Sequence, residues 1–211
     1  MDCHGTPSTT RRPMRTVDPM NDLHLQFLAT DEWRQTLEER ALPFAFGALA
    51  PADLGDDVVE VGPGPGLTTD LLRTRLPALT AVELDPELAA ALAERMAGSN
   101  VDVVEADATA MPFDDGRFSG AVTFTMLHHV PTVELQDRLF ADIRRVLRPG
   151  GLFVANDSVA SEQLAGFHHD DVYNPVDPAT LPDRLRTAGF TDVEVRRNEY
   201  AWACHARRPA S

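Results

Sequence analysis

The sequence predicts an α/β fold: a mixed seven-stranded sheet with helices on both faces, an antiparallel hairpin at its C-terminal end and a helical cap at its N-terminal end. Three observations indicate this. From residue 57 onward, short apolar runs alternate with helical patterns. These runs are almost continuously apolar, as in parallel strands that are covered on both faces. Near the C-terminus two β-type runs follow each other with almost no gap, which favours a hairpin.

The strands are predicted from runs rich in valine, leucine and phenylalanine. Five of them precede the last helix, and each is followed by a turn or by a helical pattern. The two hairpin strands, TDVEVRR and EYAWACHA, complete the sheet. The predicted strands cover residues 57–61, 79–84, 101–106, 118–125, 151–156, 191–197 and 199–206.

The helices between these strands are predicted from apolar stripes and from their end signals. The clearest helix is DPELAAALAERMAG, in which Asp85 is a good N-cap, Pro86 occupies the first position and Gly98 ends the helix. The segment VELQDRLFADIRRVL is predicted as a second helix. The sequence Pro-Gly-Gly that follows it, at 149–151, is expected to end this helix and to start the fifth strand. The predicted helices cover residues 67–76, 85–98, 133–147 and 180–190.

The N-terminal part has a different character. Residues 1–20 are polar and rich in proline and threonine, which predicts a disordered tail. Residues 21–50 read as one or two helices, broken near Pro43. We therefore expect one domain over residues 21–206, consisting of a helical cap over 21–50 and an α/β core over 56–206.

Composition narrows the classes of partner. The chain has 211 residues and a formal net charge of −14, which disfavours a nucleic-acid substrate. Its two cysteines lie at opposite ends of the chain and form neither a disulfide framework nor a zinc motif, which fits the cytoplasm. No apolar run approaches the ~18 residues of a membrane span, so no membrane partner is expected. The oligomeric state stays open between monomer and homodimer.

The segment VEVGPGPG carries the main chemical signal. Gly62, Gly64 and Gly66 alternate with two prolines, so the dinucleotide spacing G-x-G-x-x-G fails in either register. Phosphate loops use backbone N–H donors, and Pro63 and Pro65 have none. A tight, stiff glycine turn without those donors favours a ligand that lacks phosphate.

Three acids stand at the ends of predicted neighbouring strands: Glu60, Glu83 and Asp107. Because the carboxyl ends of parallel strands open onto one crevice, all three should face the same site. A carboxylate at Glu60 suits a cationic ligand. An acid at the end of the second strand commonly accepts hydrogen bonds from ribose hydroxyls, and this is the expected role of Glu83.

Together these segments resemble a class I S-adenosylmethionine-dependent methyltransferase of the small-molecule, methyltransferase type 11-like kind. VVEVGPGPG, AVELDPEL, VVEADATAMPF and RVLRPGGLF follow in the order and spacing of that family's motifs, over about residues 56–157. The resemblance implies a Rossmann-like fold and S-adenosyl-L-methionine as cofactor. It implies that the cofactor is bound by Glu60, Gly62, Pro63, Gly64, Gly66, Glu83, Leu84, Asp107, Ala108 and Thr125, with Glu83 on the ribose and Asp107 on the adenine.

Two features depart from the family pattern or leave a choice open. The fourth strand begins Phe118-Ser119, where the family usually has Phe-Asp; that Asp is generally structural. In VELDP either Glu83 or Asp85 could hold the ribose, and we favour Glu83 because Asp85 is placed to cap the following helix.

The acceptor side is less defined. Methyl transfer from a sulfonium needs mainly alignment and exclusion of water, so no catalytic residue is compulsory. His128, His129 and Asp157 are the catalytic candidates because they follow the fourth and fifth strands, although histidines at such a turn are often packed or capping groups. The candidates for contact with the acceptor are His24, Phe27, His128, Asn156, His168 and Tyr173. Trp33 is also considered, but for Phe27 and Trp33 a place in the ordinary core is the favoured interpretation.

The segment FHHDDVYNPVDP, residues 167–178, reads either as an acceptor lid carrying His168, His169, Asp170 and Tyr173 or as a solvated loop. Its histidines suggest a metal ion, but adjacent histidines on a regular element do not easily reach one ion, so no metal is expected. The favoured function is methyl transfer to a small molecule. A non-catalytic module that binds S-adenosylmethionine, and a nicotinamide-dependent oxidoreductase, are the alternatives.

Overall fold

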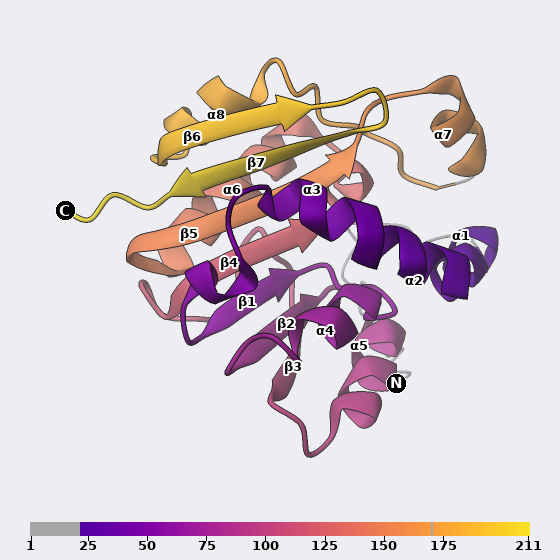
Figure 1. Cartoon of the computed structure of the whole chain (residues 1–211), viewed down its shortest axis with the longest axis horizontal. Coiled ribbons are helices and arrows are strands. Elements are labelled where there is room, and N and C mark those ends of the chain that lie inside the picture. Colours follow the sequence, from indigo (N-terminus) through magenta and orange to yellow (C-terminus); the bar gives the residue numbers. More distant parts are fainter. Residues whose placement is uncertain (1–21, 170) are drawn as a thin grey trace, which may run out of the picture.

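The computed structural model describes residues 22–169 and 171–211, and these contain one seven-stranded sheet (Figure 1). The strand order is β3-β2-β1-β4-β5-β7-β6. Strands β1 to β5 are parallel, and β7 runs antiparallel to both of its neighbours, so the predicted mixed sheet with a C-terminal hairpin is confirmed. The strands are β1 Val58–Val61, β2 Leu79–Glu83, β3 Val101–Glu105, β4 Phe118–Phe124, β5 Leu147–Ser158, β6 Thr191–Arg197 and β7 Ala201–Arg207.

Helices cover both faces of the sheet. One face packs against α6 (Val133–Val146) and α8 (Leu181–Thr187), and the other against α3 (Leu42–Phe46), α4 (Leu67–Leu72) and α5 (Pro86–Met96). Strand β1 shows why both faces must be covered, since all four of its residues are buried. Successive side chains of a strand point to opposite faces, so Val59 packs in the core beneath α6 and Val58 in the core beneath α4 and α5.

The N-terminal helical segment runs through the proline that was expected to break it. It consists of α1 (Asp22–Leu28), α2 (Asp31–Thr36), the π-helical turn η1 (Leu37–Ala41) and α3. Pro43 follows the π-helical turn η1 without a break in the helix, and the helix ends instead at Gly47, where φ is +60°. The break predicted near Pro43 is therefore wrong.

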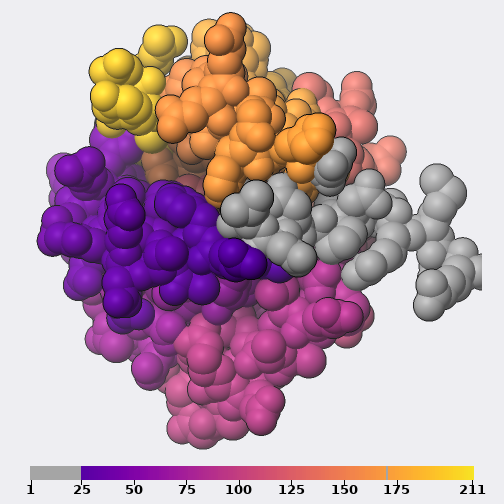
Figure 2. Space-filling model, turned by 90° about the vertical axis from the view of Figure 1, so that its right-hand side faces the viewer, coloured from indigo at the N-terminus to yellow at the C-terminus, as the bar shows by residue number. Residues whose placement is uncertain are grey.

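Contacts with the C-terminal hairpin fix the end of this segment. The Arg196 guanidinium on β6 donates hydrogen bonds to the carbonyls of Phe44 and Ala45, and the His205 ring on β7 lies 2.7 Å from the Ala45 carbonyl. The helical cap is therefore anchored on the far half of the sheet. Its first helices extend from there beside the segment that contains α7 (Glu162–Phe167), as the indigo and orange surfaces in Figure 2 show.

The fifth strand differs from the prediction. Helix α6 ends at Val146 and β5 starts at once with Leu147, so Pro149, Gly150 and Gly151 lie within the strand and do not end the helix. A register shift in the pairing of β4 with β5 absorbs the additional residues. Helix α7 and the short 3-10 helices η2 (Pro51–Leu54) and η3 (Leu127–His129) were not predicted.

The sequence also led to expectations about a disordered tail and about membrane spans. The tail predicted over residues 1–20 lies outside the described residues. Within the part of the chain that the structure describes, no helix combines the length and the apolar character needed to cross a bilayer.

Candidate cofactor and acceptor site

A cavity of about 380 Å³ opens at the carboxyl ends of β1, β2, β3 and β4. This is the place where ligands bind in open α/β sheets. Its volume is within the range of small-molecule sites. The residues from the strand ends that line it include Gly62, Glu83, Asp107 and Thr125. Of the ten predicted cofactor residues, all but Glu60 and Gly66 line this cavity.

The glycine turn after β1 forms the floor of this cavity. Gly62, Pro63 and Gly64 line it, and both glycines have positive φ, of +67° and +54°. A Cβ atom on Gly62 would lie 2.1 Å from Cγ of Met126, so only glycine fits here. Gly66 is the N-cap of α4 and does not line the cavity.

Helix α5 holds the turn from outside. The Arg95 guanidinium donates a 2.7 Å hydrogen bond to the Pro65 carbonyl and also pairs with Asp70 on α4. The turn is therefore fastened to both flanking helices and presents a preformed surface.

Glu60 has a different role from the one predicted for it. Its side chain is 1% exposed and does not line the cavity; its two carboxylate oxygens accept hydrogen bonds from the hydroxyls of Thr68 and Thr69. Burial raises the pKa of Glu60 to about 7, although these hydroxyls act in the opposite direction. Glu60 therefore ties the start of α4 to β1, and any effect on a ligand is transmitted through the glycine turn.

Glu83 joins the second strand to the glycine turn. Its Oε2 accepts a 2.9 Å hydrogen bond from the Gly64 N–H, and its Oε1 accepts one of 2.9 Å from the Asp85 N–H. Burial raises the pKa of Glu83, opposed by these backbone donors. Each carboxylate oxygen has a second lone pair, so the group can still accept hydrogen bonds from a ligand.

Asp85 is the N-cap of α5, as predicted. Its Oδ1 accepts hydrogen bonds from the N–H groups of Glu87 and Leu88. Glu83 and Asp85 both line the cavity, but the carboxylate of Asp85 is occupied with the helix start. Asp85 therefore has the capping role that was predicted for it, and the ribose role of Glu83 stays a prediction.

The remaining cofactor candidates also line the cavity. Leu84 is 40% exposed. Asp107 holds its own loop by accepting a 2.8 Å hydrogen bond from the Thr109 N–H, and Ala108, the next residue, also lines the cavity. Thr125, just beyond β4, has φ of +51°. A positive φ is unfavourable for a β-branched residue and is typical of a functional turn.

A second wall of the cavity is mostly apolar. It is built by the N-terminal helices and by the segment from β4 to α6, and its residues include Leu28, Trp33, Leu37, Met126, Val130 and Leu135. Sequence reasoning named Trp33 as either core or pocket and missed the others. The signal for Met126 and Val130 was present, because both follow the end of a predicted strand on the crevice side.

Aromatic residues of α1, α2 and α7 pack against one another, and of these Trp33 lines the cavity. The Phe27 ring lies 5.2 Å from the Trp33 ring and 5.5 Å from the Phe167 ring, measured between centroids. Phe27 therefore links the helical cap to the segment at 167–178. His24 lies on α1, but its side chain is outside the described part of the chain, as is Asp170.

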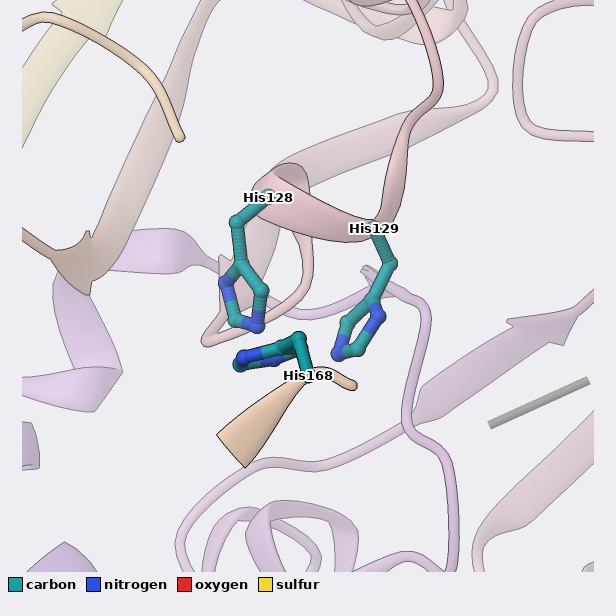
Figure 3. A group of neighbouring side chains, drawn as sticks. All are labelled: His128, His129 and His168. Carbon is teal, nitrogen blue, oxygen red and sulfur yellow. The ribbon is translucent and has the colours of Figure 1, made fainter. Parts of the chain in front are cut away.

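Three histidines gather beside the cavity: His128 and His129 from η3, and His168 from the turn after α7 (Figure 3). Ring centroids lie 4.2 Å apart for His128 and His129, and 4.9 Å apart for His128 and His168. Tyr173 stacks on His168 at 4.7 Å. Of the three histidines, His129 also lines the cavity.

Two aspartates support this cluster. The Nδ1 atom of His128 lies 2.6 Å from Oδ1 of Asp157, and the Nδ1 atom of His129 lies 3.8 Å from Oδ1 of Asp171. Burial lowers the pKa of His129 and of His168, while the His128 ring holds the pKa of Asp157 low against its burial.

The described residues that were predicted to contact the acceptor, namely Phe27, His128, Asn156, His168 and Tyr173, do not line the cavity itself. The Asn156 amide donates a 2.7 Å hydrogen bond to the Trp202 carbonyl, and its side chain does not line the cavity. His169 is exposed, next to the buried His168. Asp157 is turned toward His128, so it acts on that ring and not directly on the cavity.

The chain is similar in sequence to known methyltransferases. Residues 59–155 match the family model described as a methyltransferase domain. The chain is 36% identical over 140 residues to a probable ribosomal RNA small subunit methyltransferase A of Methanothermobacter thermautotrophicus, covering 60% of this chain and 51% of that protein. It is 31% identical over 161 residues to the O-methyltransferase cnsE of Penicillium expansum, covering 70% and 56%. The chain thus spans about half the length of these two curated relatives.

Solved structures show the same fold. Phosphoethanolamine N-methyltransferase 2 of Haemonchus contortus, solved with phosphomonomethylethanolamine and S-adenosylhomocysteine, superposes with a TM-score of 0.68 at 16% identity. That alignment covers 92% of this chain and 61% of the other.

Residues 59–155 thus match a methyltransferase domain, and the sheet around them has the fold of class I, S-adenosylmethionine-dependent methyltransferases. The resemblance noted in the sequence is confirmed at this level, and so is S-adenosylmethionine as the cofactor of the domain. The acceptor is not fixed by the comparisons, since the relatives carry the names of both RNA and O-methyltransferases.

Proposed function

We propose that this protein transfers a methyl group from S-adenosylmethionine to a small, largely apolar acceptor. The observation that carries the proposal is the unlike character of the two cavity walls. One wall offers carboxylates and backbone groups at strand ends, while the other is formed mainly by apolar side chains. A polar, charged cofactor and an apolar acceptor would divide the cavity in this way.

On the cofactor wall, the glycine turn would lie against the methionine part of the cofactor. Glu83 would accept hydrogen bonds from the ribose hydroxyls with the lone pairs left over from Gly64 and Asp85. Leu84 would cover the adenine, Asp107 and Ala108 would meet its edge, and the Thr125 carbonyl would face the ammonium group.

On the acceptor wall, the side chains would align the nucleophile with the sulfonium methyl and keep water out. The methyl group moves with the bond to sulfur breaking as the bond to the acceptor forms, and S-adenosylhomocysteine remains. The electrophile is already activated by its positive charge, so positioning supplies most of the rate. Trp33, Met126 and Leu135 are the residues best placed to select the acceptor.

An RNA acceptor is the second candidate, because it is favoured by the relatives named as ribosomal RNA methyltransferases. The formal net charge of −14 acts against it, since contacts with a phosphate backbone require clustered positive charge. The chain also spans only part of the length of those relatives.

A labelling experiment separates these candidates. The protein would be incubated with S-adenosylmethionine labelled in its methyl group, either with a small-molecule extract or with total RNA from the same cells. The proposal predicts label in the small-molecule fraction and none in RNA. Label in RNA would establish the second candidate, and no label in either fraction despite binding of S-adenosylhomocysteine would indicate a non-catalytic binding module.

A Leu135→Trp variant tests the acceptor wall separately from the cofactor wall. It would narrow the acceptor wall without touching the cofactor wall. Labelling should fall strongly, while affinity for S-adenosylhomocysteine should remain within about twofold of the unsubstituted protein.

A further inference from the structure

We propose that His128, His129 and His168 form a binding site for one divalent transition-metal ion, of which zinc is the type. One ligand nitrogen from each of these three residues lies within 4.8 Å of the other two. Figure 3 shows the three rings converging on the same space from two separate segments of the chain. Imidazole is a preferred ligand of zinc, copper, nickel and iron.

The spacing suits an ion after a small adjustment. Zinc–nitrogen bonds of ~2.0–2.1 Å in a tetrahedral site place the ligand atoms about 3.4 Å apart. From separations of at most 4.8 Å, the rings would close by no more than about 1.4 Å, a movement that side-chain rotation supplies. Three protein ligands leave a fourth position open, as in zinc sites that take part in reactions.

The hydrogen bonds of the rings determine which nitrogen is the ligand. The Nδ1 atom of His168 lies 2.7 Å from the Leu164 carbonyl, which can only accept, so Nδ1 carries the proton and the neutral ring has its lone pair on Nε2. In His128, Nδ1 faces the carboxylate of Asp157, which leaves Nε2 toward the cluster. The Nε2 atoms of all three histidines are buried.

The carboxylate of Asp157, which contacts the His128 ring, is the strongest additional indication of a metal site. Metal-binding histidines usually donate their other N–H to a carboxylate or a carbonyl, which fixes the ring and makes it a better ligand. Asp157 is itself held rigidly, because it also accepts hydrogen bonds from the backbone N–H groups of His128 and Ser158. His168 has its carbonyl partner in Leu164, so two of the three rings have the arrangement that metal sites use.

This site departs from the expectation that no metal is bound. That expectation rested on the adjacent pair His168 and His169, and the structure separates them: His168 is buried and His169 is exposed. The adjacent pair that does converge, His128 and His129, lies on the short 3-10 helix η3, and the centroids of these two rings are 4.2 Å apart. The third ligand comes from about forty residues further along the chain.

His129 belongs to the cluster and also to the cavity wall. An ion held there would lie beside the acceptor region and could bind an acceptor oxygen or sulfur, favouring loss of its proton to solvent before the methyl group arrives. This role rests on the proposed function. The binding of the ion does not, so the two can be tested separately.

The test uses the whole chain, with any purification tag removed, stripped of metal by a chelator. Binding of zinc would be measured by calorimetry, and cobalt would be added as a probe whose visible absorption reports a site of low coordination number with nitrogen ligands. The proposal predicts one ion per chain. The variants His129→Gln and His168→Gln should each weaken binding by at least about tenfold.

His169→Gln is the matched control, because it changes an exposed histidine next to a proposed ligand, and it should bind as the unsubstituted protein does. Circular dichroism and affinity for S-adenosylhomocysteine would show that each variant is folded. Absence of stoichiometric binding to the unsubstituted protein would overturn the proposal. So would equal affinities in the folded ligand variants and the control. A failure of methyl transfer with metal binding intact would overturn only the proposed function.

Discussion

The two walls of the cavity are built in different ways. On the cofactor wall, the groups lie at or just after the ends of neighbouring strands and are held by hydrogen bonds between them, such as the one from Gly64 to Glu83. On the acceptor wall, the groups come from α1, α2, η1, η3 and α6, which meet only in the folded chain. The first wall is a property of the sheet, whereas the second depends on how separate segments pack.

This difference decides how much the sequence can predict. Parallel strands bring their carboxyl ends together, so Glu83 and Asp107 could be placed at one site from strand positions alone. Glu60 shows the limit of that argument. It ends the same kind of strand, but the hydroxyls of Thr68 and Thr69 in the next helix turn its carboxylate away from the cavity, and no strand pattern contains that information.

The acceptor wall was predictable only as a set of candidates. Phe27, His128 and His168 were identified by type and position, but their partners depend on tertiary packing between segments far apart in the sequence. The fold was predicted more completely, because hydrophobic periodicity and end signals are local. The fold prediction failed at two prolines that local rules treat as breaks. At Pro43 a π-helical turn lets the helix continue, and at Pro149 a register shift lets the residues lie within β5.

The largest expected effect is on the cofactor wall, from Gly62→Ala. A Cβ atom there would lie 2.1 Å from Cγ of Met126, and φ would remain positive. Overpacking and the unfavourable φ together should cost about 2–5 kcal/mol in the free energy of unfolding, measured by urea denaturation. Adding Met126→Ala should recover part of this loss; no recovery would mean that Met126 is not the group that excludes a side chain.

The second expected effect is a pH dependence of the free energy of unfolding. It arises from Glu60, which ties the start of α4, next to the glycine turn, to β1. The pKa of Glu60 is about 7 in the folded protein against an ordinary value of 4.5. The folded state therefore binds this proton more tightly than the unfolded state, so stability from Glu60 is present at low pH and is lost as pH rises from about 4.5 to 7. The loss should approach about 3 kcal/mol.

Glu60→Gln removes this titration while keeping a group that can bond to the threonine hydroxyls. The free energy of unfolding would be measured for both proteins by urea denaturation between pH 4.5 and pH 8. The unsubstituted protein should lose stability relative to the variant as the pH rises. Parallel curves would mean that Glu60 ionises normally in the folded protein and that the turn is not held in this way.

The most direct test of the account concerns Glu83, because it joins the second strand, the glycine turn and the proposed ribose site. Calorimetry with S-adenosylhomocysteine would compare the unsubstituted protein with Glu83→Ala, with Asp85→Ala, and with Glu94→Ala as an exposed control on α5. The account predicts that Glu83→Ala weakens binding by about 1–3 kcal/mol, and that Asp85→Ala mainly destabilises α5. Unchanged affinity in Glu83→Ala together with a loss in Asp85→Ala would contradict it.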